Sequence, residues 1–206
     1  APVWHEYLAE ILKLEGLCFF DHVKANDISH LATAVAILAP GCEPEGIEQF
    51  LSNGGAVVCF RPGQKALRLA ALEDSGPKPG PVQLWLTEPL ALAGLGTDLP
   101  VLGPAATYLG NEDAPAAGYL LVESDYSSPS PGLVERKVGN GTLVVFAYDL
   151  PACVARLRQG EPERSGFIPT GDTIPRPCYL YSDTSPGDAG WLPHADFHCM
   201  LLGDVV

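Results

Sequence analysis

Residues 31–67 read LATAVAILAPGCEPEGIEQFLSNGGAVVCFRPGQKAL, and the order of their apolar runs and turns determines the expected fold. The nearly all-apolar run 31–40 ends in Pro-Gly, and a second continuous apolar run covers residues 56–60. Such runs are typical of strands that are buried on both faces of a parallel sheet. Between them, residues 43–52 carry apolar side chains on one face and end at a glycine pair. This pattern predicts a helix that connects two parallel strands.

The segment before this unit adds an amphipathic helix and a short strand. Apolar side chains recur at helical spacing over residues 4–17, and residues 18–20 read as a strand. The order helix, strand, strand, helix, strand indicates an open α/β sheet with crossover helices. A doubly wound domain normally opens with a strand, so we expect that the first strand is missing or that the chain was cut from a longer protein.

Further runs extend this organisation to the end of the chain. We expect strands at 81–86, 117–124 and 143–148, helices at 152–158 and 193–206, and a long surface excursion at 159–190. The sequence therefore predicts a single α/β domain over residues 1–206. Its expected architecture is an open, mostly parallel, flavodoxin-like sheet with helices on both faces.

Composition and charge restrict the classes of partner. Of the 206 residues, 47% are hydrophobic and only 18% are charged, which excludes a wholly disordered chain. The net charge of −13 repels a phosphate backbone and an anionic membrane surface, so we expect neither nucleic acid nor membrane as a partner. No apolar run reaches about 18 residues, the length that spans a bilayer.

The six cysteines are far apart in sequence, and none forms a Cys-x-x-Cys pair. This spacing argues against a zinc ribbon and against a thioredoxin-like redox motif. Cys18, Cys59 and Cys153 stand in apolar runs, where a free thiol acts as a small hydrophobic group. We therefore expect reduced core thiols rather than a disulfide framework, and this favours a cytoplasmic location.

Two stretches resemble the class I glutamine amidotransferase-like fold. In the first, the strand 56–60 follows the turn Gly54-Gly55 and precedes the sharp turn 61–64, as at the nucleophile elbow of that family. In the second, residues 139–149 read GNGTLVVFAYD, similar to an element near the end of such domains. The likeness extends to the trimerisation domains of certain β-galactosidases and to relatives that have lost catalysis. It implies an amidotransferase-like α/β fold, with other domains or subunits as partners.

The sequence departs from the active family at the elbow. Where that family carries roughly Gly-x-Cys-x-Gly, the alignment places Arg61 at the nucleophile position, and Cys59 falls two residues earlier, inside the strand. A cysteine inside a buried strand is desolvated, which disfavours its thiolate. The family's His-x-Glu also has no counterpart after Tyr148, where the chain continues Asp-Leu-Pro. We therefore expect no amidotransferase activity.

A candidate ligand site lies at the carboxyl edge of the predicted sheet. Arg61 and Asp149 each directly follow a predicted strand, and loops at this edge bind ligands in open α/β sheets. The long excursion contributes Asp172, Arg176 and Asp183 to the same expected site. Because the net charge opposes anions, a neutral, hydroxyl-rich ligand such as a sugar fits better. The alternative is a structural ion pair between Arg61 and Asp149.

Two histidines offer a second candidate site. His194 and His198 stand four residues apart on the last predicted helix, so both side chains lie on one face and would supply two zinc ligands. Asp172 or Asp183 would then supply a third. The alternative is a chance pair on a helix surface. No cofactor is expected, because Gly94-x-Gly96 follows no strand and precedes no helix.

These observations together predict a non-catalytic amidotransferase-like domain that serves assembly or ligand binding within a larger carbohydrate-processing or hydrolytic protein. An open sheet edge beside residues 31–39 predicts self-association or docking on a partner. The alternative function is a stand-alone hydrolase that uses loop carboxylates near Arg61.

Overall fold

The computed structural model describes residues 4–24, 26–78, 82–87, 98–110, 116–122, 125–160 and 194–206, together with residues 164, 166 and 168. The helices are α1 (Trp4–Leu14), α2 (Ile47–Ser52), α3 (Gln64–Leu69), α4 (Leu150–Gln159) and α5 (His194–Val205). The strands are β1 (Val35–Leu38), β2 (Ala56–Phe60), β3 (Leu72–Pro77), β4 (Val82–Leu86), β5 (Asp98–Val101), β6 (Ala106–Gly110), β7 (Ala116–Val122), β8 (Asp125–Val138) and β9 (Gly141–Phe146). In this part of the chain, no helix is long and apolar enough to cross a membrane.

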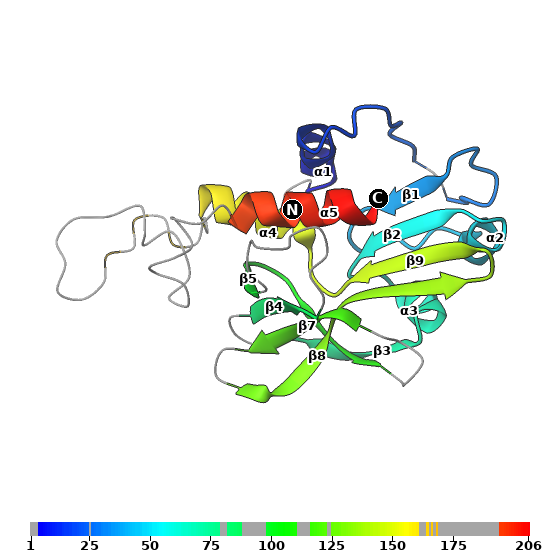
Figure 1. The fold of residues 1–206 in the computed structure, drawn as a ribbon. Helices are drawn as coiled ribbons and strands as arrows, with labels where there is room; N and C mark the ends of the chain where they lie inside the picture. Colours follow the sequence, from blue (N-terminus) through cyan, green and yellow to red (C-terminus); the bar gives the residue numbers. More distant parts are fainter. Residues whose placement is uncertain are drawn as a thin grey trace.

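A seven-stranded mixed sheet, in the order β1-β2-β9-β8-β7-β4-β5, dominates the α/β fold (Figure 1). Only the pairs β1–β2 and β2–β9 are parallel, while the four pairs from β9 to β5 are antiparallel. The prediction of a mostly parallel, flavodoxin-like sheet is therefore wrong for the described residues. The reason is connection length, because two residues join β7 to β8 and β8 to β9, whereas a parallel crossover needs a dozen or more.

The parallel part of the sheet matches the sequence prediction closely. β2 occupies the predicted residues, and β1 and α2 lie within the predicted strand 31–40 and helix 43–52. The side chains of β2 from Val57 to Phe60 and those of β9 from Leu143 to Phe146 are all buried. Burial of consecutive residues requires cover on both faces of the sheet. α2 packs against both strands and supplies part of that cover.

The antiparallel part alternates between a buried and an outer face. The residues Leu99, Leu84 and Leu120 face each other across β5, β4 and β7, and all three are buried. Their neighbours along β4 and β7 are more exposed, whereas Pro100, next to Leu99 on β5, is also buried. A small second sheet of β3 and β6 contacts β8. Antiparallel sheets of this kind commonly leave one face in water.

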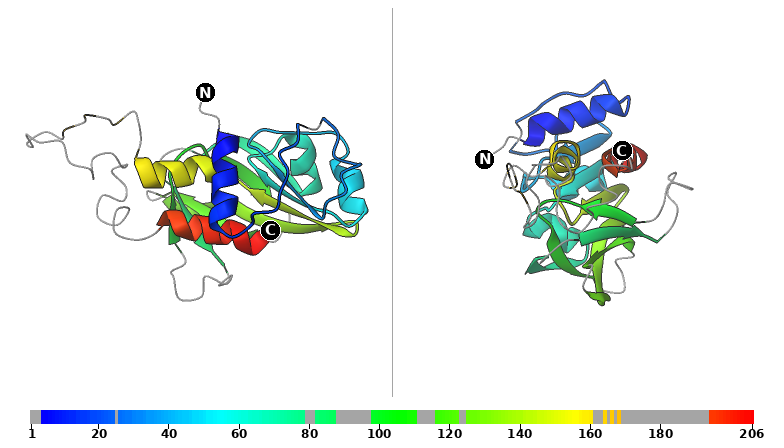
Figure 2. Two further views of the ribbon diagram at one scale, coloured as in Figure 1. Left: turned by 90° about the horizontal axis from the view of Figure 1, so that it is seen from above. Right: turned by 90° about the vertical axis from the view of Figure 1, so that its left-hand side faces the viewer.

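Helices α1, α4 and α5 pack on one another beside the sheet (Figures 1 and 2). Their positions confirm the predicted helices at 4–17, 152–158 and 193–206. The predicted strand at 18–20 does not form, and the side chain of Phe19 in this segment is fully exposed. The excursion predicted for 159–190 lies almost wholly outside the described residues.

A close backbone contact fixes the start of β9. A Cβ atom on Gly141 would overlap the carbonyl oxygens of Gly55 and Leu51, which belong to the backbone at the start of β2 and in α2. The Thr142 N–H donates to the carbonyl oxygen of Gly55 at 3.3 Å. Glycine at position 141 therefore lets β9 approach α2 and β2 closely enough to pair.

We predict that Gly141→Ala lowers the free energy of unfolding by about 1–3 kcal/mol, because the new methyl group meets backbone atoms that cannot rotate away. Chemical denaturation followed by circular dichroism measures the change.

Gly203→Ala is the matched control. The nearest atom to its added methyl group is Glu15 Oε2 at 3.4 Å, and the residue lies in α5, so this change stabilises by up to about 1 kcal/mol. Equal stability of Gly141→Ala and the parent protein would contradict the proposed close contact.

Candidate functional site

The strand–turn–helix unit β2–Arg61–α3 has the form of an elbow. Arg61 directly follows β2 and has a φ of 45°, a left-handed conformation that a residue with a side chain seldom adopts. Its N–H donates to the carbonyl oxygen of Phe146 at 2.8 Å, so the elbow is fastened to the end of β9. A sharp, strained turn therefore presents the Arg61 side chain at the carboxyl edge of the parallel strands.

Asp149 lies at the same edge, as the sequence predicted. Its N–H donates to the carbonyl oxygen of Pro104, and the Ala106 N–H donates to the carbonyl oxygen of Ala147. The chain entering β6 is thereby fixed alongside the chain leaving β9. The edge thus combines residues from β2, β9 and the start of β6.

The Asp149 carboxylate has a structural role of its own. Its Oδ1 accepts a hydrogen bond from the Ala152 N–H at 3.0 Å and so caps the N-terminus of α4. Burial raises the pKa of this carboxyl group, while the Ala152 hydrogen bond and the charges of Arg61 and Arg156 oppose that rise. Asp149 is therefore a buried acid that two guanidinium groups influence from a distance.

The structure gives no ion pair between Arg61 and Asp149, both of which lie among the described residues. The Arg61 Nε is instead buried and has no hydrogen-bond partner. A buried donor without a partner carries a desolvation cost of about 1–3 kcal/mol. The structural ion pair that the sequence left open is thus not formed, although the two charges act on each other.

The sequence did not identify Tyr108 and Arg156 as members of this cluster. Tyr108 on β6 is 2% exposed, and burial raises the pKa of its phenol, while the Arg61 charge lowers it. Arg156 stands on α4, seven residues after Asp149, a spacing that places both residues on one helix face. This spacing could have predicted from the sequence that Arg156 lies near Asp149. No strand was predicted at β6, so no sequence pattern placed Tyr108 at this edge.

Cys59 is unsuited to nucleophilic chemistry, as the sequence predicted. The side chain is 1% exposed, and its Sγ donates to the carbonyl oxygen of Val144 at 3.5 Å. Burial raises the pKa of the thiol to about 12, so the thiolate is not available near neutral pH.

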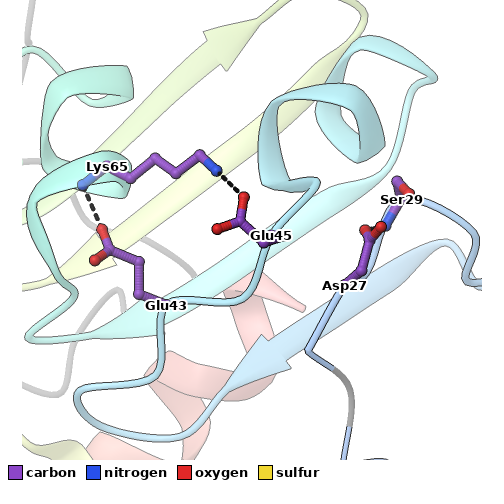
Figure 3. A network of polar contacts seen from close by, with 5 residues as sticks. All are labelled: Asp27, Ser29, Glu43, Glu45 and Lys65. Atoms are coloured by element: carbon purple, nitrogen blue, oxygen red, sulfur yellow. Dashed lines mark hydrogen bonds and ion pairs between the residues drawn. The ribbon is translucent and has the colours of Figure 1, made fainter.

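A polar network beside the elbow occupies the start of α3 (Figure 3). The Lys65 N–H donates to the Glu43 carboxylate, and the Lys65 ammonium pairs with Glu45 at 2.8 Å. Nearby, Asp27 Oδ1 accepts from the Ser29 N–H at 2.8 Å. The loop after β1 therefore places a carboxylate at the helix start, where an active elbow uses backbone N–H groups to hold an oxyanion.

Three of the predicted site residues, Asp172, Arg176 and Asp183, lie outside the described residues. The structure therefore brings together Arg61 and Asp149 alone from the predicted ligand set. The larger ligand site and the alternative of a hydrolase with loop carboxylates stay predictions.

The second predicted site centres on His198, which is fully buried on α5. Its Nε2 lies 3.0 Å from the carbonyl oxygen of Pro100, and its Nδ1 lies 2.9 Å from the Tyr148 hydroxyl. Because a carbonyl only accepts, Nε2 carries the proton and Nδ1 accepts from Tyr148. Both ring nitrogens are used within the protein. His194, one turn earlier, lies edge-to-face against Phe197.

Metal binding by this histidine pair stays a prediction, because the proposed third ligands lie outside the described residues. Among the residues that the structure describes, no group of three or more His, Cys, Asp or Glu side chains could hold a metal ion.

The His198 network closes one edge of the sheet. β5 is the last strand in the sheet order, and its Pro100 carbonyl accepts from His198. The Leu102 N–H donates to Cys153 Sγ at 3.3 Å, and this sulfur lies 3.6 Å from His198 Nε2. Side chains of α4 and α5 thus hydrogen-bond to a carbonyl group and an N–H group at this edge. Without these bonds, the two backbone groups could pair with a strand of another chain.

The other cysteines divide into buried and exposed thiols. Cys59, Cys153 and Cys199 are buried and free, which confirms reduced core thiols at the first two. The prediction is wrong for Cys18, which is exposed and free, as is Cys42. Cys178 lies outside the described residues.

Comparisons with known proteins identify solved structures with a similar fold, but they identify no family for this chain. No protein-family model matches the chain, and no curated protein matches its sequence. Among solved structures, α-L-fucosidase isoenzyme 2 from Paenibacillus thiaminolyticus is 19% identical with a TM-score of 0.56, and the match covers 73% of this chain and 26% of that one. A cytoplasmic protein from Salmonella typhimurium LT2 is 12% identical with a TM-score of 0.53, over 97% and 86% of the two chains.

A β-galactosidase from Rahnella sp. R3 also matches, at 17% identity and a TM-score of 0.45, over 55% of this chain and 20% of that one. The chain therefore spans about a fifth to a quarter of the length of these two glycosidase chains. At such low identity, the likenesses to the fucosidase and to the Salmonella protein establish a shared fold alone.

We predict that acid destabilises the protein through His198. Burial lowers the pKa of the folded imidazole to about 4, against about 6.5 in the unfolded chain. The stabilising contribution is complete above about pH 6.5 and falls by about 3 kcal/mol as the pH drops towards 4, because only the unfolded chain takes up the proton readily. Denaturation at about pH 7 and about pH 4.5 measures this change.

The variant His198→Gln should lose most of this pH dependence, because glutamine at position 198 does not titrate in the window. His22→Gln, which alters an exposed histidine, is the control and should keep it. Equal acid sensitivity of His198→Gln and the parent protein would assign the effect to other groups.

Proposed function

We propose that this chain is a non-catalytic amidotransferase-like domain that serves assembly or ligand binding within a larger carbohydrate-processing protein. The observation that carries the proposal is the elbow, where Arg61 occupies the strained position after β2. In the resembled family this position carries the nucleophile. An arginine side chain is a permanent cation and cannot attack a carbonyl group.

Three further features support the loss of amidotransferase chemistry. The nearest cysteine, Cys59, is sealed inside β2. The Glu43 carboxylate accepts the Lys65 N–H at the start of α3, where it would repel a developing oxyanion. Asp149, which follows β9, caps α4 instead of orienting a histidine.

The context of a larger carbohydrate-processing protein rests on fold likeness. The fucosidase that shares the fold is a much longer chain, of which the match covers 26%. We extend this arrangement to the present chain as part of the proposal, with other domains or subunits as partners.

The ligand class follows from the groups at the carboxyl edge. Arg61 provides a donor without a hydrogen-bond partner, and Asp149 provides a carboxylate at the same edge. A donor and an acceptor at one edge suit hydroxyl groups, which both donate and accept. The net charge of −13 disfavours an anion at long range, so a neutral, sugar-like ligand fits best.

We predict that the protein does not hydrolyse glutamine and that 6-diazo-5-oxo-norleucine, which alkylates the cysteine nucleophile of glutaminases, leaves Cys59 unmodified. The thiol is buried and un-ionised, so it does not react in the folded state. Mass spectrometry of the intact and digested protein detects any adduct. Iodoacetamide, a general thiol reagent, should modify the exposed Cys18 under native conditions and thereby shows that exposed thiols can be detected. Glutaminase activity that disappears in Cys59→Ser would overturn the proposal.

We also predict that Arg61→Gly stabilises the protein by about 0.5–1 kcal/mol. Glycine relieves the left-handed backbone strain, and the side chain that is removed has an unpaired buried nitrogen. Such a gain is expected where a residue is kept for binding rather than for stability.

Ala71→Gly is the matched control, because Ala71 has a φ of 57°. It should give a similar gain in thermal and chemical denaturation. A loss of stability in Arg61→Gly beside a gain in Ala71→Gly would show that Arg61 is structural, and the ligand-binding part of the proposal would fail.

A further inference from the structure

The outer face of the antiparallel strands carries a row of side chains that the site at the carboxyl edge does not use. The register places Trp85 of β4 opposite Asp98 of β5 and opposite Tyr119 of β7. Residues directly opposite each other in antiparallel strands share one face, and neighbouring strands lie about 4.8 Å apart. The two aromatic side chains are therefore neighbours in one row across the sheet.

This row faces away from the core. The residues one position along each strand, Leu84 and Leu120, are fully buried, whereas Trp85 is 42% exposed and Tyr119 is half-buried. Gln83 stands two residues before Trp85 on β4 and therefore lies on the same outer face, also half-buried. Exposed tryptophan on a regular sheet is unusual, because burying a side chain of this size is strongly favourable.

The size of this surface indicates what binds there. A stable protein interface buries about 800 Å² on each partner. Two partly exposed aromatic side chains provide well under about 400 Å², since each buries at most about 250 Å² in full. The two aromatic side chains alone therefore provide much less area than a protein interface needs, and this area matches one or two rings of a small ligand.

The charge of the surface selects among small ligands. β4 and β7 carry no charged residue, and the exposed Asp98 adds a negative charge to a chain of net charge −13. An anionic ligand would be repelled. A neutral pyranose ring fits, because its C–H face stacks on an aromatic ring. Its hydroxyl groups hydrogen-bond to an amide such as Gln83 and to a carboxylate such as Asp98.

We propose that the outer face of β4 and β7 binds a neutral oligosaccharide, with Trp85 and Tyr119 as the stacking platform and Gln83 and Asp98 as polar contacts. This site lies in the antiparallel half of the sheet. The proposed oligosaccharide site does not depend on Arg61 or on the absence of glutaminase activity, so its test is independent of the proposed function.

Isothermal titration calorimetry with cellohexaose, mannohexaose and β-1,4-galactohexaose tests the proposal. At least one of these neutral probes should bind saturably, and the hexamer of galacturonic acid should bind at least about tenfold more weakly because of its charge. Trp85→Ala should abolish binding, and Tyr119→Ala should weaken it about tenfold. Circular dichroism confirms that each variant is folded.

Leu109→Ala is the matched control, since Leu109 is 56% exposed but lies on β6, in the other sheet. It should bind like the parent protein, and Trp85→Phe should restore part of the binding that Trp85→Ala loses. The proposal is overturned if none of the neutral hexasaccharides binds up to about 10 mM, or if Trp85→Ala binds as tightly as the parent.

Discussion

The parallel pairing of β2 with β9 is the contact on which the rest of the structure depends. It exists because Gly141 lets the backbone of β9 approach that of Gly55 and Leu51 without a side chain between them. β9 is also the strand at which the sheet changes from parallel to antiparallel. The same pairing brings the ends of the two strands together, so that Arg61 and Asp149 meet at one edge. Fold and candidate site therefore share a single constraint.

The sequence predicted the parallel half well, and in the rest of the structure it predicted β4 and β7 but missed β3, β5, β6 and β8, for physical reasons. β2 is a continuous apolar run that local pattern identifies, and it occupies the predicted residues. β3 reads LEDSGP and β8 contains two prolines, so both consist largely of residues that are uncommon in strands. β3 is extended because β6, far away in sequence, pairs with it, and no local signal reports such a partner. β8 is extended because β7 and β9, each two residues away along the chain, pair with it on both sides.

The sequence predicted the residues of the candidate site that directly follow a predicted strand. It did not predict the residues that other segments bring to the same edge. Arg61 and Asp149 follow strands that the sequence identified. The cap that Asp149 forms was also readable, because Pro151 stands in the first turn of the following helix. Tyr108 and Glu43 reach the edge from β6 and from the loop after β1, and their positions follow from the pairing of chain segments far apart in sequence.

The long separation between β2 and β9 has a consequence for how the chain folds during synthesis. β2 must wait for residues 61–140 before its neighbour exists, and ribosomes add about 5–20 residues each second. For roughly 4–16 s, one side of an uncharged apolar strand therefore lacks its partner. Pairing over such a distance also slows folding, because the intervening chain must be ordered first. The nascent chain therefore passes through an aggregation-prone interval that ends only when β9 leaves the ribosome.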